Sequence, residues 1–538
     1  MRFRFLLAFC LLFSCVAFAQ GPPLPPSAPG SASAPSIPPP APTFSAPPPV
    51  PVGKPPAGVH SWRPAPTLDE LRAHLEQLEK QYNALEIPKD LQNLALLRFK
   101  LEQGRLYLAQ LENRNAFLWR EDMQRRFAAA LDWADVIGQT QGDASMTPLS
   151  FHERAYIAPA DGSAQPYWIY LPQDYSSRRR YPLAVFLHGY DPAINKIEPW
   201  LLSEEMQKIA SRRGVIVAVP YGRRNSDFIH IGEDDTLRVA DEAQARYSVD
   251  PQRVFLMGVS MGGYGVYAVG LHHPGRFAGA SALCGRTDTY LWLRLDRDAL
   301  PAWKRILYDA DDPQLLRRNA LDLPFQIQHG ARDNIVPTQH SRRMVADLKL
   351  LNYNVRYTEY TNLDHFIYFE ETVLDNALSW VAQNRALPPS RRVAYTTGSL
   401  RDNHSRWAAI NAFEDYTRLA TITAEVKSRN LVEVQIENVA AFTLTPPAEW
   451  LDAKLPITLK VNGVAGVLPH GGTSLQWRKN PAPETETLRK TPTRSGPIKN
   501  VIAIRFCWSM ELWAGRKTKR RRAASLTSGN CTPTAFRR

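Results

Sequence analysis

The stretch Val254-Phe255-Leu256-Met257-Gly258-Val259-Ser260-Met261-Gly262-Gly263 places an apolar run directly before Gly258-Val259-Ser260-Met261-Gly262. Glycines two residues to either side of a serine are typical of a sharp strand-to-helix turn, because other residues would collide with the chain segments that meet there. Turn residues at 250–253 and small, apolar residues at 264–271 favour this interpretation over an incidental serine in a glycine-rich loop. Ser260 is therefore the candidate nucleophile.

A serine hydroxyl needs a base to take its proton and an acid to orient that base. Residues 323–328 predict a strand whose following loop carries Asp333, and residues 354–360 predict another whose following loop carries His365. The order serine, aspartate, histidine, each just beyond a separate strand, is the chain order of an α/β-hydrolase triad. We expect Ser260, Asp333 and His365 to act together.

Two other aspartates are rival acids, Asp364 and Asp288. Asp364 adjoins His365 in sequence, so its carboxylate would have to reach round the backbone to the neighbouring imidazole. A single aspartate or histidine more often caps a turn or forms a structural hydrogen bond than catalyses. With Asp333 as the acid, the serine, the aspartate and the histidine each follow a separate predicted strand. Asp333 is therefore the preferred acid.

Attack on a carbonyl also needs hydrogen-bond donors for the oxyanion. The N–H of Met261, directly after the nucleophile, is the expected first donor. The strand expected at residues 181–187 is followed by His188-Gly189-Tyr190, and the Tyr190 N–H is the expected second donor. His188 and His329 are interpreted as structural hydrogen-bonding residues.

From about residue 151 to 387, the chain resembles the prolyl-oligopeptidase and esterase D-like branch of the α/β hydrolases, in its secreted bacterial form. The resemblance implies Ser260 as nucleophile, Asp333 as orienting acid and His365 as base. Prolyl oligopeptidases carry a β-propeller over the site, whereas no repeat of about 40–50 residues that could form blades is found in this sequence. The motifs that carry the resemblance are His188-Gly189-Tyr190, Gly258-Val259-Ser260-Met261-Gly262-Gly263, His329-Gly330-Ala331-Arg332-Asp333-Asn334-Ile335-Val336-Pro337 and Leu363-Asp364-His365.

The amino terminus predicts export. Residues 1–19 have the basic start, apolar run and small-residue cleavage site of a signal peptide, and the run is too short for a good membrane span. Cleavage before Cys15 as a lipoprotein is the alternative. Residues 20–66 are rich in proline, alanine and serine and predict an extended linker. We expect a secreted or periplasmic protein without a transmembrane segment in the mature chain.

The 538 residues, 44% of them hydrophobic, predict two or three folded units. Leucines at three- and four-residue spacing predict a helical hairpin at 67–140, with a short dimerising coiled coil as the less favoured alternative. The catalytic domain is expected at 150–388. Short alternating runs with an Asn462-Gly463 turn predict a β-rich, sandwich-like domain at 391–480, where Trp407 and Trp450 either pack internally or bind polysaccharide.

Residues 481–538 form a basic tail that we expect to be disordered. From residue 489 onward it holds thirteen Lys or Arg and the single acid Glu511, so it carries nearly all of the net charge of +13. The charge therefore gives no reason to infer nucleic-acid binding by the catalytic domain. The tail lacks periodicity, and we interpret it as the product of a shifted reading frame.

These observations predict an α/β protein that acts as an exported serine hydrolase on a small ester or short peptide, which is either free or attached to polysaccharide. Cys284 is expected to be a small buried residue rather than a nucleophile. No metal cluster, phosphate-binding loop or dinucleotide fingerprint stands out in the sequence, so no cofactor is expected. The alternative is a non-catalytic wall-binding or polysaccharide-binding protein with a vestigial hydrolase fold.

Overall fold

A computed structural model describes residues 65–85, 92–113, 120–139, 151–197, 199–452, 454–468, 474–479 and 490. The predicted signal peptide at 1–19, the alternative lipoprotein site at Cys15, nearly all of the linker at 20–66 and almost the whole basic tail lie outside these residues. Among the helices within the described ranges, none has the length and apolar character needed to span a membrane.

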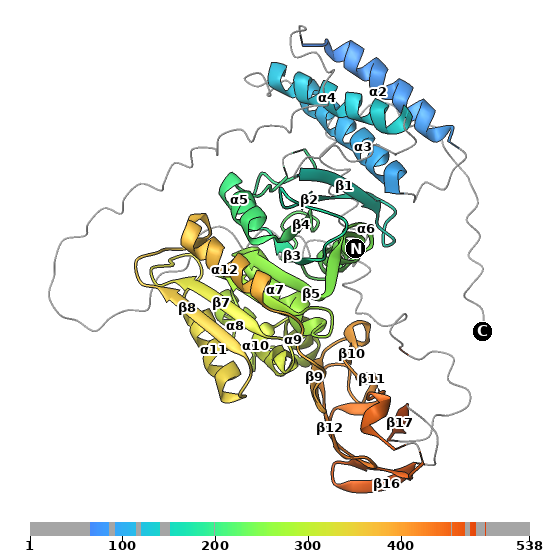
Figure 1. Cartoon of the computed structure of the whole chain (residues 1–538), viewed down its shortest axis with the longest axis vertical. Coiled ribbons are helices and arrows are strands. Elements are labelled where there is room, and N and C mark those ends of the chain that lie inside the picture. Colours follow the sequence, from blue (N-terminus) through green and yellow to red (C-terminus); the bar gives the residue numbers. More distant parts are fainter. Residues whose placement is uncertain are drawn as a thin grey trace, which may run out of the picture.

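A mixed β-sheet forms the centre of the predicted catalytic domain (Figure 1). Its strands lie in the order β1-β2-β4-β3-β5-β6-β7-β8. The pairs β1–β2 and β2–β4 are antiparallel, and the remaining pairs are parallel. The strands are β1 Phe151–Ile157, β2 Ala164–Tyr170, β3 Tyr181–Leu187, β4 Ile216–Pro220, β5 Val249–Val259, β6 Gly279–Leu283, β7 Phe325–Gly330 and β8 Val355–Tyr360.

Both faces of this sheet are covered, which explains why the central strands are continuously apolar. In β3, Leu183 and Val185 belong to one buried core and Ala184 and Phe186 to the other, as the two-residue period of a strand requires. Helices α6, α7 and α11 pack on the first face, and α5 and α12 pack on the second. These helices are α5 Glu204–Arg213, α6 Ile231–Arg246, α7 Met261–His272, α11 Gln339–Leu350 and α12 Glu371–Gln383.

The connection from β6 to β7 contains short helices at α8 Thr289–Leu293, α9 Ala302–Asp309 and α10 Pro313–Leu316 and a 3₁₀ turn at Arg317–Ala320. Another 3₁₀ turn, Ile367–Phe369, follows β8 and precedes α12. These connections start at the carboxyl ends of the parallel strands. This edge of the sheet is where α/β enzymes bind ligands.

The described amino-terminal part contains three helices, α2 Leu68–Asn83, α3 Gln92–Glu112 and α4 Arg120–Gln139. The hairpin expected at 67–140 thus has its second helical segment divided into α3 and α4. Thr67 and Glu70 form the capping box that starts α2. The leucine seam of α2 is buried against α3 and α4, so it packs within the chain as a helical unit. Figure 1 shows this unit beside β1, opposite the carboxyl-terminal domain.

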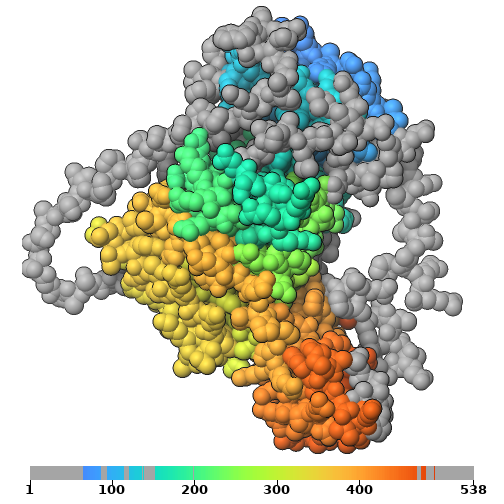
Figure 2. Space-filling view, viewed as in Figure 1, coloured from blue at the N-terminus to red at the C-terminus, as the bar shows by residue number. Residues whose placement is uncertain are grey.

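The carboxyl-terminal domain consists of two sheets around a common core, within the residues that the structure describes. Both Trp407 and Trp450 pack in or against this core, and the Trp407 Nε1 donates to the Ser390 oxygen. Figure 2 shows the domain as a separate lobe at the end of the molecule. One sheet has the order β16-β15-β13-β12-β9 and the other β10-β11-β14-β17. The strands are β9 Arg392–Thr397, β10 His404–Ser405, β11 Ala408–Phe413, β12 Ala420–Ser428, β13 Leu431–Glu437, β14 Val439–Leu444, β15 Ile457–Val461, β16 Val464–Leu468 and β17 Leu475–Arg478.

Candidate active site

Ser260 lies on the sharp turn between β5 and α7, with φ 54° and ψ −114°. A Cβ atom on Gly258 would lie 2.5 Å from the Gly262 oxygen, and one on Gly262 would lie 2.0 Å from the Leu187 oxygen. Both obstacles are backbone atoms, so these two positions need glycine. The glycine spacing therefore allows the strained turn that presents the serine at the carboxyl end of β5.

The structure brings together the three residues that the sequence predicts. His365 Nε2 lies 2.8 Å from Ser260 Oγ, and His365 Nδ1 lies 2.7 Å from Asp333 Oδ2. Asp333 comes from the loop after β7 and His365 from the loop after β8. The imidazole is only 3% exposed, so bulk water does not compete for these two hydrogen bonds.

Asp333 is held by four donors. Its Oδ1 accepts from the N–H groups of Ile335 and Val336 at 2.9 and 2.8 Å, and its Oδ2 accepts from His329 Nε2 at 3.0 Å as well as from His365. Burial alone would raise the pKa of Asp333, but the hydrogen bonds from His329 and His365 hold it well below its usual range. The ionised carboxylate keeps the hydrogen of His365 on Nδ1, so that Nε2 can accept the serine proton.

The two rival aspartates are engaged elsewhere. Asp364 Oδ1 accepts from the Phe366 N–H at 2.8 Å. Asp288 caps α8 through the Leu291 N–H and forms an ion pair with Arg343. These contacts give both carboxylates structural roles, whereas Asp333 contacts the imidazole.

The two expected oxyanion donors belong to adjacent strand ends, since Leu187 at the end of β3 pairs with Gly258 near the end of β5. Met261 is the first residue of α7, and Tyr190, which is 43% exposed, follows β3. His188 is buried beneath this loop, with its ring nitrogens 2.8 and 3.2 Å from the oxygens of Gly189 and Tyr221. Burial lowers the pKa of His188, which fits a neutral, structural side chain.

Trp200 is a neighbour of this loop that the sequence did not indicate. Its ring stacks on His188 with centroids 6.0 Å apart and an interplanar angle of 19°. A Cβ atom on Gly189 would lie 3.3 Å from the Trp200 ring. Because Trp200 contacts both residues before Tyr190 and has no neighbouring motif, only the fold reveals that it supports this turn.

Cys284 lies at the end of β6 and is fully buried. Burial raises the pKa of its thiol, so the side chain is a protonated, inert neighbour of the site. Potential ligand atoms of Cys284, Asp333 and His365 lie within 4.8 Å of one another. Since both nitrogens of His365 already have partners, this group fits a proton-transfer triad better than a metal site.

A second buried cluster lies where α6 and α7 meet the carboxyl-terminal domain, and it includes Glu233, His272 and Asp402. His272 Nδ1 lies 2.8 Å from Glu233 Oε1, and His272 Nε2 lies 2.9 Å from the Ala310 oxygen. Burial alone would lower the pKa of His272, but the Glu233 carboxylate raises it to about 10. A charged imidazole that donates from both nitrogens is an ion-pair partner and has no lone pair for a metal.

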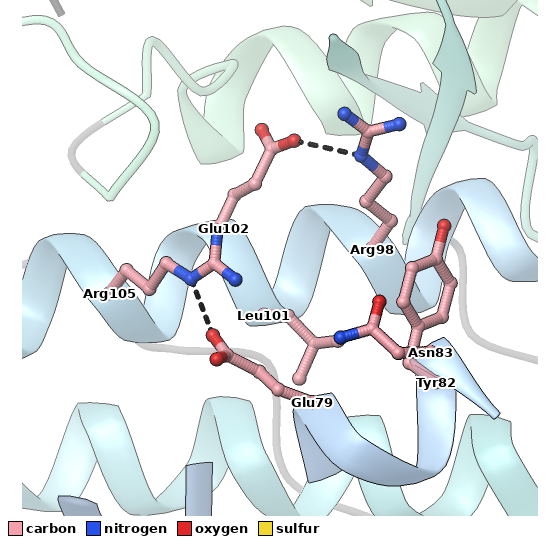
Figure 3. A pocket seen from close by; sticks show the side chains of 7 residues that line it. All are labelled: Glu79, Tyr82, Asn83, Arg98, Leu101, Glu102 and Arg105. Atoms are coloured by element: carbon pink, nitrogen blue, oxygen red, sulfur yellow. Dashed lines mark hydrogen bonds and ion pairs between the residues drawn. The ribbon is translucent and has the colours of Figure 1, made fainter. Parts of the chain in front are cut away.

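A cavity of about 270 Å³ lies within the helical unit, between α2 and α3. Figure 3 shows two ion pairs in its wall, Glu79 with Arg105 and Glu102 with Arg98. The charges in the wall therefore balance, and the cavity is separate from the Ser260 site. Its lining is Glu79, Tyr82, Asn83, Arg98, Leu101, Glu102 and Arg105.

Comparison with known proteins agrees with this geometry. Residues 231–386 match the model of the prolyl oligopeptidase family. The chain is 26% identical over 151 residues to dipeptidyl-peptidase 5 of Porphyromonas gingivalis, a match that covers 26% of this chain and 22% of the relative. The chain thus spans about a fifth of the length of that curated relative.

Solved structures to which the chain is similar include the Staphylococcus aureus fluorophosphonate-binding serine hydrolase FphF, at 19% identity and a TM-score of 0.36, over 43% of this chain and 98% of that one. A putative dipeptidyl aminopeptidase IV from Bacteroides ovatus is also 19% identical, with a TM-score of 0.38, over 44% of this chain and 36% of that one.

Proposed function

We propose that Ser260, His365 and Asp333 are the catalytic triad of a serine hydrolase domain, within which residues 231–386 match the prolyl oligopeptidase family. The observation that carries the proposal is the position of His365, which is hydrogen-bonded to Ser260 through one ring nitrogen and to Asp333 through the other. The reaction we propose is hydrolysis of an ester or peptide bond through an acyl-enzyme.

In this mechanism Ser260 Oγ attacks the carbonyl carbon while His365 Nε2 takes its proton. The backbone N–H groups of Met261 and Tyr190 stabilise the negative oxygen of the tetrahedral intermediate. The carbonyl re-forms, the bond to the leaving group breaks, and His365 returns the proton to the departing oxygen or nitrogen. Water then repeats the sequence on the acyl-serine, and Asp333 stabilises the imidazolium in both halves.

The substrate we propose is a small ester or a short peptide. The name of the Porphyromonas gingivalis relative supports a peptide, although the match covers only part of that protein. The amino-terminal residues that the structure describes form helices rather than propeller blades, which supports a site open to esters as well. Trp407 and Trp450 pack internally, so they give no support to attachment of the substrate to polysaccharide.

We also propose that the enzyme is exported, with removal of residues 1–19. Support comes from the sequence pattern alone. Amino-terminal sequencing of the native protein tests it: a chain that starts at Gln20 supports secretion or release into the periplasm, and a lipidated Cys15 supports anchoring as a lipoprotein.

The activity is tested with purified full-length mature protein on p-nitrophenyl acetate, methyl ferulate and a Pro-p-nitroanilide peptide. Ser260→Ala is expected to lose about 10⁴-fold or more in kcat, whereas Cys284→Ala, a change at an inert buried neighbour, retains activity. Turnover of esters alone identifies an esterase, and cleavage of the anilide identifies a peptidase. No turnover of any of the three substrates, together with no labelling by a fluorophosphonate, would favour the alternative of a non-catalytic binding protein.

A further inference from the structure

Three aromatic side chains follow His365 almost directly in the chain: Phe366, Tyr368 and Phe369. Phe366 is 38% exposed and Phe369 is 65% exposed, although neighbouring Ile367 is buried. Large aromatic side chains contribute most to stability when they are buried. Two adjacent exposed phenylalanines beside a triad histidine are therefore better explained by contact with a ligand than by packing.

The rings form a continuous ladder that begins at the imidazole. The Phe366 ring lies 5.7 Å from the His365 ring, edge to face, and the Phe369 ring stacks on Phe366 at 6.2 Å with an interplanar angle of 22°. The Tyr368 ring lies 6.3 Å from the His365 ring and 4.7 Å from the Phe369 ring. Tyr368 therefore contacts both the first and the last ring of the ladder. The ladder therefore leads from the proposed proton donor to the surface.

The turn that carries these rings is well fixed. Asp364 caps the Phe366 N–H, and the Phe369 N–H donates to the Phe366 oxygen at 3.0 Å. Ile367, at 1% exposure, anchors the turn in the core beneath α12. Because the backbone is fixed, a ligand that contacts the two phenylalanines has little ordering of the turn to overcome.

The chemistry of the triad decides which part of a substrate meets this ladder. His365 Nε2 must lie within hydrogen-bond distance of the leaving atom, because it protonates that atom as the acyl bond breaks. The leaving group is therefore the part of the substrate beside the imidazole. A ring one or two bonds beyond the leaving atom is then close enough to stack on Phe366, and a larger ring system reaches Phe369.

We propose that Phe366, Tyr368 and Phe369 form a subsite for an aromatic leaving group, a proposal that rests on the function assigned above to Ser260 and His365. During acylation the Ser260 Oγ–acyl bond forms, the acyl–oxygen bond breaks, and the aromatic alcohol leaves with the proton from His365. In a peptide the same subsite receives an aromatic side chain of the residue after the cleaved bond.

The test compares methyl, benzyl and 2-naphthylmethyl acetate with the full-length mature protein. The three esters share one acyl-enzyme, so kcat/KM reports binding and acylation of each leaving group while deacylation is common to all. We expect the aromatic esters to be preferred. Phe366→Ala should lower kcat/KM for both aromatic esters by about tenfold, and Phe369→Ala should do so for 2-naphthylmethyl acetate. Both variants should change kcat/KM for the methyl ester by less than about twofold.

Leu350→Ala is the matched control, because Leu350 is an 87% exposed apolar side chain at the end of α11. It should change none of the three rates. Labelling by a small alkyl fluorophosphonate, whose fluoride leaving group has no ring, should proceed at the wild-type rate in Phe369→Ala.

The outcomes separate the two proposals. Normal labelling together with an unchanged preference for aromatic esters in both phenylalanine variants overturns the subsite and leaves the triad standing. Equal losses of kcat/KM on the methyl and aromatic esters overturn the subsite as well. Such losses would mean that the rings position the imidazole and do not bind the leaving group. A wild-type protein that neither labels nor hydrolyses any ester or peptide overturns the proposed function, and the subsite with it.

Discussion

His329 Nε2 lies 3.0 Å from Asp333 Oδ2, the same carboxylate oxygen that accepts from His365. The Val336 oxygen lies 2.9 Å from the same nitrogen, so Nε2 carries the hydrogen and Nδ1 faces the hydroxyl of Ser341. His329 is thus a positioning residue, which fixes the acid without touching the proposed reaction centre.

We therefore expect His329→Leu to lower kcat by about tenfold, toward the lower end of the ~1.5–3 kcal/mol of a hydrogen bond to a charged group. His329→Gln, whose amide can place a donor near the position of Nε2, should recover part of the loss. Steady-state kinetics on one ester measures both, with KM expected to change little. Equal activity in the two variants would show that the ring fills space only.

Asp333→Asn is expected to lower kcat/KM by about 10⁴-fold, because the amide no longer holds the hydrogen of His365 on Nδ1. Asp364→Asn is the matched control, since Asp364 is adjacent to the imidazole in sequence but caps the Phe366 N–H. It should retain activity within about threefold. Steady-state kinetics of the two purified variants measures both losses in kcat/KM. A larger loss in Asp364→Asn than in Asp333→Asn would identify Asp364 as the acid.

The helical unit docks next to the loop that carries Tyr190. Lys196 Nζ lies 2.8 Å from Glu102 Oε2 on α3, and Gln103 Nε2 donates to the Lys196 oxygen at 3.0 Å. Lys196 is almost fully buried, so Glu102→Gln leaves a buried ammonium without its carboxylate. We expect a loss of about 1–3 kcal/mol in the free energy of unfolding, because Gln keeps an acceptor for Lys196 but not the charge. We also expect a lower kcat, because this loop carries the proposed oxyanion donor.

Urea unfolding and ester kinetics measure these effects. The double variant Glu102→Leu with Lys196→Met should recover most of the stability, since an apolar pair can replace a buried ion pair. Glu112→Gln is the control, because Glu112 pairs with Arg72 at the surface of the same unit. A loss of stability in Glu112→Gln as large as in Glu102→Gln would contradict the assignment.

Local chemistry made Ser260 predictable, because Gly258 and Gly262 meet backbone atoms that any side chain would strike. Asp333 and His365 were predictable because each follows its own strand and the order of parallel strands is set by chain topology. The division of the second helical segment and the ion pair of Glu102 with Lys196 were not. Such contacts join residues far apart in the chain, and neither partner has a neighbouring motif.

The same limit applies to the aromatic ladder. Phe366 and Phe369 are ordinary apolar residues in the sequence, which gives no sign of their exposure. Only the 3₁₀ turn at Ile367–Phe369 shows that Ile367 faces the core while both phenylalanines stay exposed. A 3₁₀ helix has about three residues per turn, so the residues that flank a buried position face away from it. The sequence does not show which residue of this turn is the buried one.

The buried pair of His272 and Glu233 makes stability depend on pH. Burial alone would lower the pKa of His272, but the Glu233 carboxylate raises it from 6.5 to about 10. The folded protein therefore binds this proton more tightly than the unfolded chain does. The stabilisation is fully present below pH 6.5 and is lost as the pH rises toward 10.

The groups that face His272 across the junction are Glu233, Asp402 and Asp311, with His273 and Arg401 alongside the two carboxylates Glu233 and Asp402. We expect the melting temperature of the wild type to fall between pH 7 and pH 10 more steeply than that of the double variant His272→Gln with Glu233→Gln. The double variant removes the charge pair without leaving either partner buried alone. Differential scanning calorimetry across this range measures the two slopes. Because all other titrating groups are common to both proteins, parallel slopes would mean that His272 is neutral in the folded state.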